Sequence, residues 1–199
     1  MNEPGNKSRA EAMDKFNVLF TSSGRRVSLI RAFRKSFQRE KIKSKLIGAD
    51  FSRLAPTSQV VDKFYNVPRV DSMDYIPSLL EICKKEKIDL LVPLIDTELM
   101  ALAQSRDSFK KTGAFAMISS PETIEIAMDK MKTSEFFLSR ECKAVRTFCL
   151  KDIRWKEELV FPFILKPAKG SASIGVHKVN NEMELEILAR NIKEPLVQE

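Results

Sequence analysis

Short apolar segments alternate with amphipathic segments along the first 120 residues. Strands are expected at 16–21, 45–50, 64–67, 89–94 and 114–118. Between the first two, Val27, Ile30, Phe33 and Phe37 recur every three or four positions, which is typical of a helix with one buried face. Further helices are expected from Asp74 onward and over 97–108. Strands that alternate with helices form βαβ units, so this pattern predicts a Rossmann-like parallel sheet with four helical crossovers.

The pattern changes after Pro121. Helices are expected at 122–128, 133–140 and 182–191, and strands at 144–150, 161–167, 175–179 and 196–198. This order is typical of an α+β lobe, within which Trp155 is expected to pack. The predicted organisation is therefore α/β with three parts: a disordered polar tail at 1–15, a Rossmann-like domain at 16–120, and a lobe at 121–199. Because the chain stops directly after a strand, the lobe is expected to be truncated.

Composition excludes several classes of protein. Hydrophobic residues make up 43% of the 199 positions, but no apolar run reaches the roughly 18–20 residues of a membrane helix. The N-terminus lacks the apolar segment of a secretory signal, which favours a cytoplasmic protein. Cys83, Cys142 and Cys149 show no CxxC spacing, and the chain has one histidine, His177. Neither a metal site nor a disulfide scaffold is predicted, and the cysteines are expected to be buried packing residues.

The formal charge of +7 is concentrated at one end of the chain. Residues 1–45 contain twelve Lys and Arg against four Asp and Glu, whereas the remaining residues contain twenty-two against twenty-three. In the first predicted helix, most of the basic residues fall opposite the apolar face, and no aromatic residues are interleaved with them. This distribution indicates a solvated helix face rather than a nucleic-acid-binding surface.

The segment 161–176 carries the clearest chemical pattern. An apolar strand delivers Lys166, and the loop from Gly170 to Gly175 then returns into another strand. Small residues let backbone N–H groups approach an anion, Ser171 and Ser173 add hydroxyl donors, and lysine supplies a compact positive charge. The segment is interpreted either as a phosphate-binding loop or as a glycine-rich hairpin with an exposed lysine.

Other polar residues follow the strands of the Rossmann-like half, where such sheets bind ligands. Arg25 and Arg26 precede a helix and are either an anion site or solvated charge. Asp96 and Glu98 could bind an amine of a substrate or cap a helix, and capping is favoured. Asp50 is placed like the ribose-binding acid of a dinucleotide site. However, the preceding loop has one glycine where that motif needs three, which disfavours an NAD-dependent oxidoreductase.

Taken in order, these segments resemble the ATP-grasp superfamily. Asp129-Lys130 opens a helix, Ile164-Leu-Lys-Pro167 and the glycine-serine loop follow about forty residues later, and Leu196-Val-Gln-Glu199 resembles the strand that enters the adenine-binding hinge. The segments 17–26 and 91–96 resemble the carbamoyl-phosphate synthase large-subunit branch, whose pre-ATP-grasp domain is Rossmann-like. The resemblance covers residues 16–199.

The resemblance implies an ATP site and a reaction class. Lys130 and Lys166 would contact the phosphates, Gln198 and Glu199 would lie beside the adenine, and a flexible loop would close over the triphosphate. This loop would comprise Gly170, Ser171, Ala172, Ser173 and Gly175. The implied reaction is ATP-dependent activation of a carboxylate as an acyl phosphate, followed by attack of an amine or similar nucleophile.

The same resemblance implies Mg²⁺, with its ligands in a second lobe that is absent from this sequence. No catalytic or metal-binding residue is therefore assigned, and the 199-residue chain alone is expected to be inactive. The substrate is not identified, and a homodimer is left open. The alternative interpretation is a non-catalytic module that binds a nucleotide or metabolite.

Overall fold

The computed structural model describes residues 15–152 and 160–199. The predicted disordered tail, apart from Lys15, and Trp155 lie outside the described residues. The chain divides into two compact units, Met1–Pro121 and Glu122–Glu199, here called the N-terminal and C-terminal units. Each is described separately.

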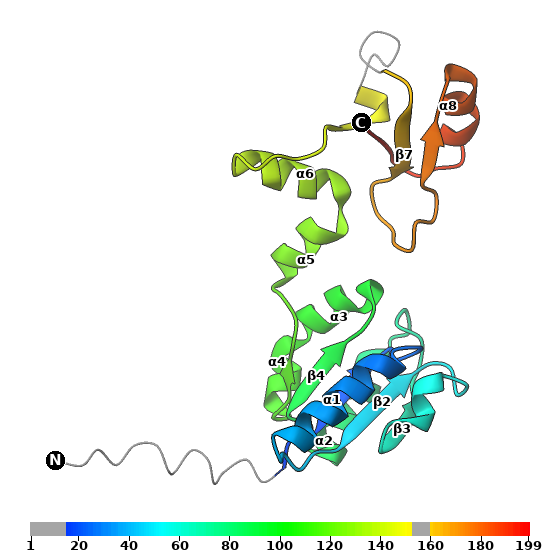
Figure 1. The fold of residues 1–199 in the computed structure, drawn as a ribbon. Helices are drawn as coiled ribbons and strands as arrows, with labels where there is room; N and C mark the ends of the chain where they lie inside the picture. The colour runs from blue at the N-terminus through cyan, green and yellow to red at the C-terminus, as the bar shows by residue number, and fades with distance from the viewer. Residues whose placement is uncertain (1–14, 153–159) are drawn as a thin grey trace, which may run out of the picture. The chain divides into compact units, whose positions relative to one another are not determined.

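The N-terminal unit is built on a five-stranded sheet in the order β3-β2-β1-β4-β5. Figure 1 labels its strands β2, β3 and β4. Every neighbouring pair is parallel, which confirms the predicted α/β class. The strands are β1 (Val18–Thr21), β2 (Leu46–Asp50), β3 (Lys63–Asn66), β4 (Leu90–Pro93) and β5 (Phe115–Ala116). The helices are α1 (Val27–Arg39), α2 (Tyr75–Glu86), α3 (Leu99–Gln104) and α4 (Arg106–Lys111).

Alternating side chains of the strands form a core on each face of this sheet. On one face, Val18 and Phe20 of β1 pack with Ile30 of α1, and Phe33 packs edge-to-face on Phe20 at 5.0 Å between ring centroids. On the other face, Leu19 packs with buried residues of α2, α3 and α4. Helices therefore cover both faces, which leaves the carboxyl ends of the strands to the connecting loops.

Two predicted connections differ from the structure. The link between β2 and β3 contains only a short 3-10 helix, Pro56–Gln59, so the expected four helical crossovers are wrong at this point. The helix expected over 97–108 is a 3-10 turn, Asp96–Glu98, followed by α3 and α4. The expected helix is interrupted at Ser105 by hydrogen bonds between residues three positions apart. Ser105 N donates to Leu102 O at 3.1 Å, and Ser108 N donates to Ser105 O at 2.9 Å. Apolar periodicity continues across such a break and does not reveal it.

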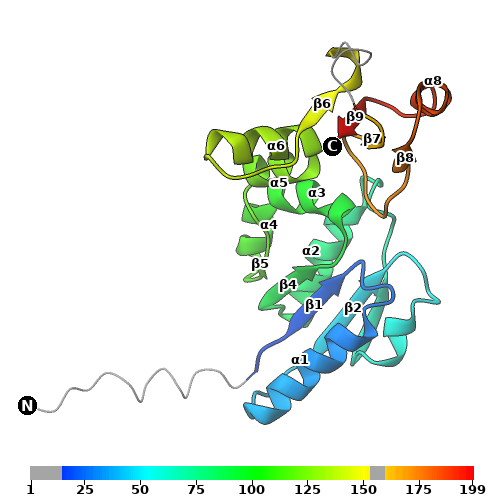
Figure 2. The same ribbon diagram turned by 45° about the horizontal axis from the view of Figure 1, so that its top comes forward.

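The C-terminal unit contains an antiparallel four-stranded sheet in the order β6-β9-β7-β8 (Figure 2). These strands are β6 (Thr147–Cys149), β7 (Phe163–Pro167), β8 (His177–Val179) and β9 (Pro195–Gln198). Its helices include α6 (Lys130–Ser139) and α8 (Glu182–Ala189), and α5 (Pro121–Met128) begins at the boundary. Helix α6 begins at Lys130 rather than near Thr133, because the Asp129 side chain accepts hydrogen bonds from Met131 N and Lys132 N and caps the helix there.

Two expectations from composition can be compared with this structure. Among the described helices, none has the length and apolar character needed to cross a bilayer. Cys83 is buried, and burial raises the pKa of its thiol to about 12. Cys149 is half-buried, but Cys142 is exposed, because it lies in the loop after α6. The expectation that all three cysteines are buried is therefore wrong for Cys142.

Candidate functional site

The loop between β7 and β8 has an unusual backbone (Figure 1). Gly170 and Gly175 have φ angles of 128° and 74°, and Ala172 and Ser173 between them are also left-handed, at 56° and 58°. A Cβ atom at Gly175 would lie 3.3 Å from Cδ of Pro167. Glycine at that position therefore lets the loop return closely over the end of β7.

The start of α6 is attached to this loop. Lys130 N donates to Ala168 O at 3.0 Å, and Lys130 Nζ donates to Gly170 O at 3.2 Å and to Ala168 O at 3.4 Å. Asp129 forms an isolated antiparallel bridge with Lys169. The capped N-terminus of α6 thus places the Lys130 ammonium group beside the first residues of the loop.

Lys166 is held between strands. Its Nζ donates to Oε1 of Gln198 on the adjacent strand β9, and Gln198 Nε2 donates to Thr147 Oγ1 on β6 at 3.0 Å. Burial lowers the pKa of Lys166 below its ordinary value of 10.5, and the positive charge of Lys130 lowers it further. Both lysines line the same hollow, and their ammonium groups repel each other there.

A hollow of about 400 Å³ brings most of the predicted nucleotide-site residues together. Its lining includes Lys130, Lys166, Gly170, Ser171, Ser173 and Gln198, together with the apolar Ile164, Ile174 and Val176. Ala172 and Gly175 belong to the loop but do not line the hollow. Glu199 does not line it either, and its carboxylate pairs with Arg146 at 3.0 Å. Within the described chain neither lysine pairs with a carboxylate, so the hollow presents uncompensated positive charge and apolar walls.

A second hollow of about 400 Å³ shares Lys130, Lys166 and Gln198 with the first. It adds residues that the sequence analysis missed, including Lys143, Ser134 and Thr147. Ser134 Oγ is buried and has no hydrogen-bond partner among the described residues. The pairing of β6 with β9 places Thr147 opposite Gln198, 51 positions away, and no local sequence signal could have indicated it.

Removing the Lys130 charge is expected to raise the pKa of Lys166. In Lys130→Met the repulsion is lost, but burial remains, so the pKa rises toward 10.5 without reaching it. Lys130→Arg keeps the charge and is the matched control. NMR titration of the lysine side-chain ¹³Cε signals measures both. If Lys166 titrates at the same pH in Lys130→Met as in the unmodified chain, the two ammonium groups are not close.

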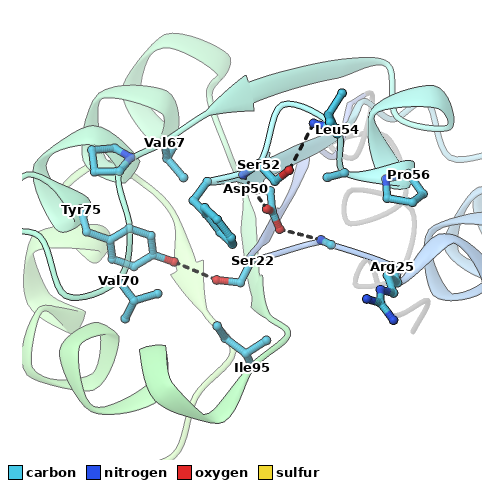
Figure 3. Close-up of a pocket in the computed structure, with 14 residues that line it drawn as sticks. Ser22, Arg25, Asp50, Ser52, Leu54, Pro56, Val67, Val70, Tyr75 and Ile95 are labelled. Carbon is cyan, nitrogen blue, oxygen red and sulfur yellow. Dashed lines mark hydrogen bonds between the residues drawn. The ribbon is translucent and has the colours of Figure 1, made fainter.

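The N-terminal unit has its own hollow, of about 460 Å³, at the carboxyl ends of β1 and β2 (Figure 3). Asp50 is nearly buried, and its carboxylate accepts hydrogen bonds from Gly24 N at 2.7 Å and Ser52 N at 2.9 Å. Arg25 lines the hollow, and its guanidinium group has no hydrogen-bond or ion-pair partner in the described part of the chain. Phe51 and Tyr75 also contribute to the wall, and the local sequence gave no signal for either.

The other candidate residues of this unit have separate roles. Glu98 is 0% exposed, and its Oε1 accepts from Leu94 N at 2.9 Å and Ile95 N at 3.2 Å. Its Oε2 accepts from Ser22 Oγ at 3.1 Å and from the Tyr75 hydroxyl. Glu98 thus makes the capping contacts that the sequence favoured. Asp96 and Arg26 are exposed and line neither this hollow nor the others.

The acidic side chains that the structure describes do not gather into a metal site. Among the described residues, no group of three or more His, Cys, Asp or Glu side chains could hold a metal ion. The polar groups that converge in the C-terminal unit are ammonium, hydroxyl and amide groups, which suit an anion.

Comparison with solved structures identifies the class of fold. The chain is similar to N5-carboxyaminoimidazole synthetase from Staphylococcus aureus in complex with ADP (TM-score 0.69, 19% identity), covering 93% of this chain and 48% of that one. It is also similar to L-amino acid ligase from Bacillus licheniformis (TM-score 0.67, 16% identity; 92% and 43%). A third similar structure is biotin carboxylase from Campylobacter jejuni (TM-score 0.65, 15% identity; 96% and 46%). These structural neighbours are in the ATP-grasp superfamily.

At these identities the likeness shows the fold alone, and the chain spans less than half the length of each of these proteins. The family follows from the sequence itself: residues 18–118 match the model described as "PylC-like, N-terminal domain". Because this match covers half of the chain, the protein belongs to that family. No curated protein sequence matches it.

Proposed function

We propose that this chain is the ATP-binding portion of an ATP-grasp ligase that joins a carboxylate to an amine or similar nucleophile. In this proposal, residues 16–120 are the pre-ATP-grasp domain, and residues 121–199 are part of the N-terminal lobe of the ATP-grasp domain. The observation that carries the proposal is the hollow beside the β7–β8 loop, where Lys130 and Lys166 converge without a carboxylate partner among the described residues.

The contacts of this hollow support a triphosphate rather than a neutral ligand. The two ammonium groups line the same hollow and would both be stabilised by a shared anion. The serine hydroxyls and the backbone of the left-handed loop add neutral donors on the same side. Ile164 and Val176 provide apolar contacts of the kind that a base requires. Lys130 and Lys166 are assigned to the phosphates, and Gln198 and Glu199 to the adenine edge.

The proposed reaction begins with transfer of the γ-phosphoryl group of ATP to a substrate carboxylate. The resulting acyl phosphate is then attacked by the nucleophile, with release of phosphate. This chain's residues would hold the triphosphate in position and neutralise part of its charge. Mg²⁺ belongs to the proposal, with ligands outside the described residues. The segments 17–26 and 91–96 favour the carbamoyl-phosphate synthase-like branch of the superfamily.

Replacement of Lys166 by Met is expected to weaken binding of Mg-ATP by about tenfold or more. The variant loses a charge-assisted hydrogen bond to phosphate, a contact typically worth about 1.5–3 kcal/mol. Titration of ATP into the ¹⁵N-labelled chain, followed by NMR, would report affinity through the amide signals of Gly170–Gly175.

Lys151→Met is the matched control, because Lys151 is an exposed lysine of the same unit that lines neither hollow. AMP is the ligand control, since it lacks the β- and γ-phosphates. Equal affinity of the two variants for ATP, or equal affinity of the unmodified chain for ATP and AMP, would overturn the assignment of this hollow to a triphosphate.

A further inference from the structure

The hollow of the N-terminal unit has the size and walls of a small-molecule site. At about 460 Å³ it falls in the usual range of ligand pockets, roughly 300–1,000 Å³. Two of the apolar side chains that line it are strongly exposed, Leu54 at 90% and Phe51 at 60%. Val70 and Ile95 extend the apolar wall. Exposed apolar side chains gathered around a concavity are typical of a binding site.

The two buried acids at this place are already engaged. Both oxygens of Asp50 accept backbone N–H groups, and both oxygens of Glu98 accept hydrogen bonds from the protein. Asp50 thereby holds the turn after β1 against the turn after β2. Glu98 accepts hydrogen bonds from Ser22 and Tyr75, which both line the hollow. Figure 3 shows the hydrogen bond between these two side chains. These carboxylates are therefore positioning groups, because each of their oxygens already accepts a hydrogen bond from the protein.

The charged side chain at the hollow that has no hydrogen-bond or ion-pair partner among the described residues is cationic. Arg25 reaches the hollow from the turn after β1, and in Figure 3 it lies across Ser22 and Asp50 from Tyr75. Throughout residues 15–152 and 160–199, no hydrogen bond or ion pair occupies its guanidinium group, which offers five N–H donors in a planar fork. Such a fork matches the geometry of a carboxylate or a phosphate.

We propose that this hollow binds an organic anion with an apolar body, whose carboxylate or phosphate pairs with Arg25 while the body contacts the wall that contains Phe51, Val70 and Ile95. An amine is disfavoured, because Asp50, the carboxylate that lines the hollow, is 5% exposed and both its oxygens already accept backbone N–H groups. The site lies within the N-terminal unit and does not rest on the nucleotide site proposed for the C-terminal unit.

The test is an NMR titration of the full ¹⁵N-labelled chain with five small probes and no ATP. Phenylacetate and phenyl phosphate carry both an anion and a ring, and they distinguish the two sources of the anion. Phenylacetamide is neutral, phenethylamine is cationic, and acetate lacks the body. We expect at least one ring-bearing anion to shift the amide signals of Gly24 and Ser52 with a Kd of about 1 mM, and about tenfold more tightly than the other three probes.

Arg25→Gln is expected to weaken binding of that anion about tenfold, since a charge-assisted contact is lost. Arg26→Gln removes the same charge from an exposed neighbour that does not line the hollow, and should leave the affinity unchanged. Retained amide spectra show that both variants fold. The proposal is overturned if no ring-bearing anion shifts these signals. It is also overturned if phenethylamine, phenylacetamide or acetate binds as tightly, or if the two variants lose affinity equally.

Discussion

Glu98→Ala is expected to lower the free energy of unfolding of the N-terminal unit by about 3 kcal/mol. The substitution leaves the backbone N–H groups of Leu94 and Ile95 and the hydroxyls of Ser22 and Tyr75 without their acceptor. Because Glu98 is 0% exposed, water cannot replace these contacts without opening the structure. Native-state hydrogen exchange of the β1 and β4 amides measures the loss.

Two further variants distinguish the contribution of the Glu98 carboxylate to stability from the effect of any substitution in this turn. In Glu98→Gln the amide oxygen still accepts the two backbone N–H groups and the amide NH₂ can donate to the Tyr75 oxygen, so a loss of about 1–2 kcal/mol is expected. Asp96→Ala, at an exposed position two residues earlier, should change the free energy by less than about 0.5 kcal/mol. A loss in Glu98→Ala no larger than in Asp96→Ala would show that Glu98 does not hold this site together.

Glu98 also illustrates where sequence reasoning about the site ends. Asp96 and Glu98 lie in the same short turn, and both residue types suit capping or ligand binding. What distinguishes them is burial, which depends on Tyr75 and Ser22 reaching the same point from two other elements. Such convergence is a property of the folded sheet, so the sequence left both roles open.

The strands of the sheet were predictable for a physical reason. β1 and β2 are buried throughout, and a strand covered by helices on both faces is expected to be apolar. Both strands are apolar or glycine up to their last residues, Thr21 and Asp50. Connections carry no such constraint. The 3-10 helix at Pro56–Gln59 and the break at Ser105 depend on local hydrogen bonds that leave no periodic pattern.

The hollow beside the β7–β8 loop contains residues that could be predicted from the sequence and residues that could not. Lys166 and the glycine-rich loop are adjacent in sequence, so their proximity could be predicted from the hairpin they form. Gln198 was placed only through the family resemblance, and Thr147 was not placed at all. Both reach the hollow because β9 lies between β6 and β7, an order that the strand sequence does not dictate.

Leu165→Ala is expected to cost about 3 kcal/mol in the C-terminal unit, which would remove much of that unit's stability. Leu165 is 0% exposed and belongs to a cluster whose other fully buried members, among the described residues, are Phe163, Val179, Leu185 and Val197. The truncation removes the contacts of Leu165 with this small cluster, and the surrounding side chains relax only partly into the cavity that is left.

The matched control is a substitution of the neighbouring residue, Ile164→Ala. Ile164 precedes Leu165 and therefore points to the opposite face of β7, where it lines the hollow together with Lys166. Ile164 is half-buried, so Ile164→Ala should cost about 1 kcal/mol while weakening the apolar contacts offered to a bound base. Hydrogen exchange of the β7 and β9 amides reports the stability of each variant. Equal losses in the two variants would mean that β7 does not divide its side chains between a core face and a site face. The geometry assigned to Lys166 would then be wrong.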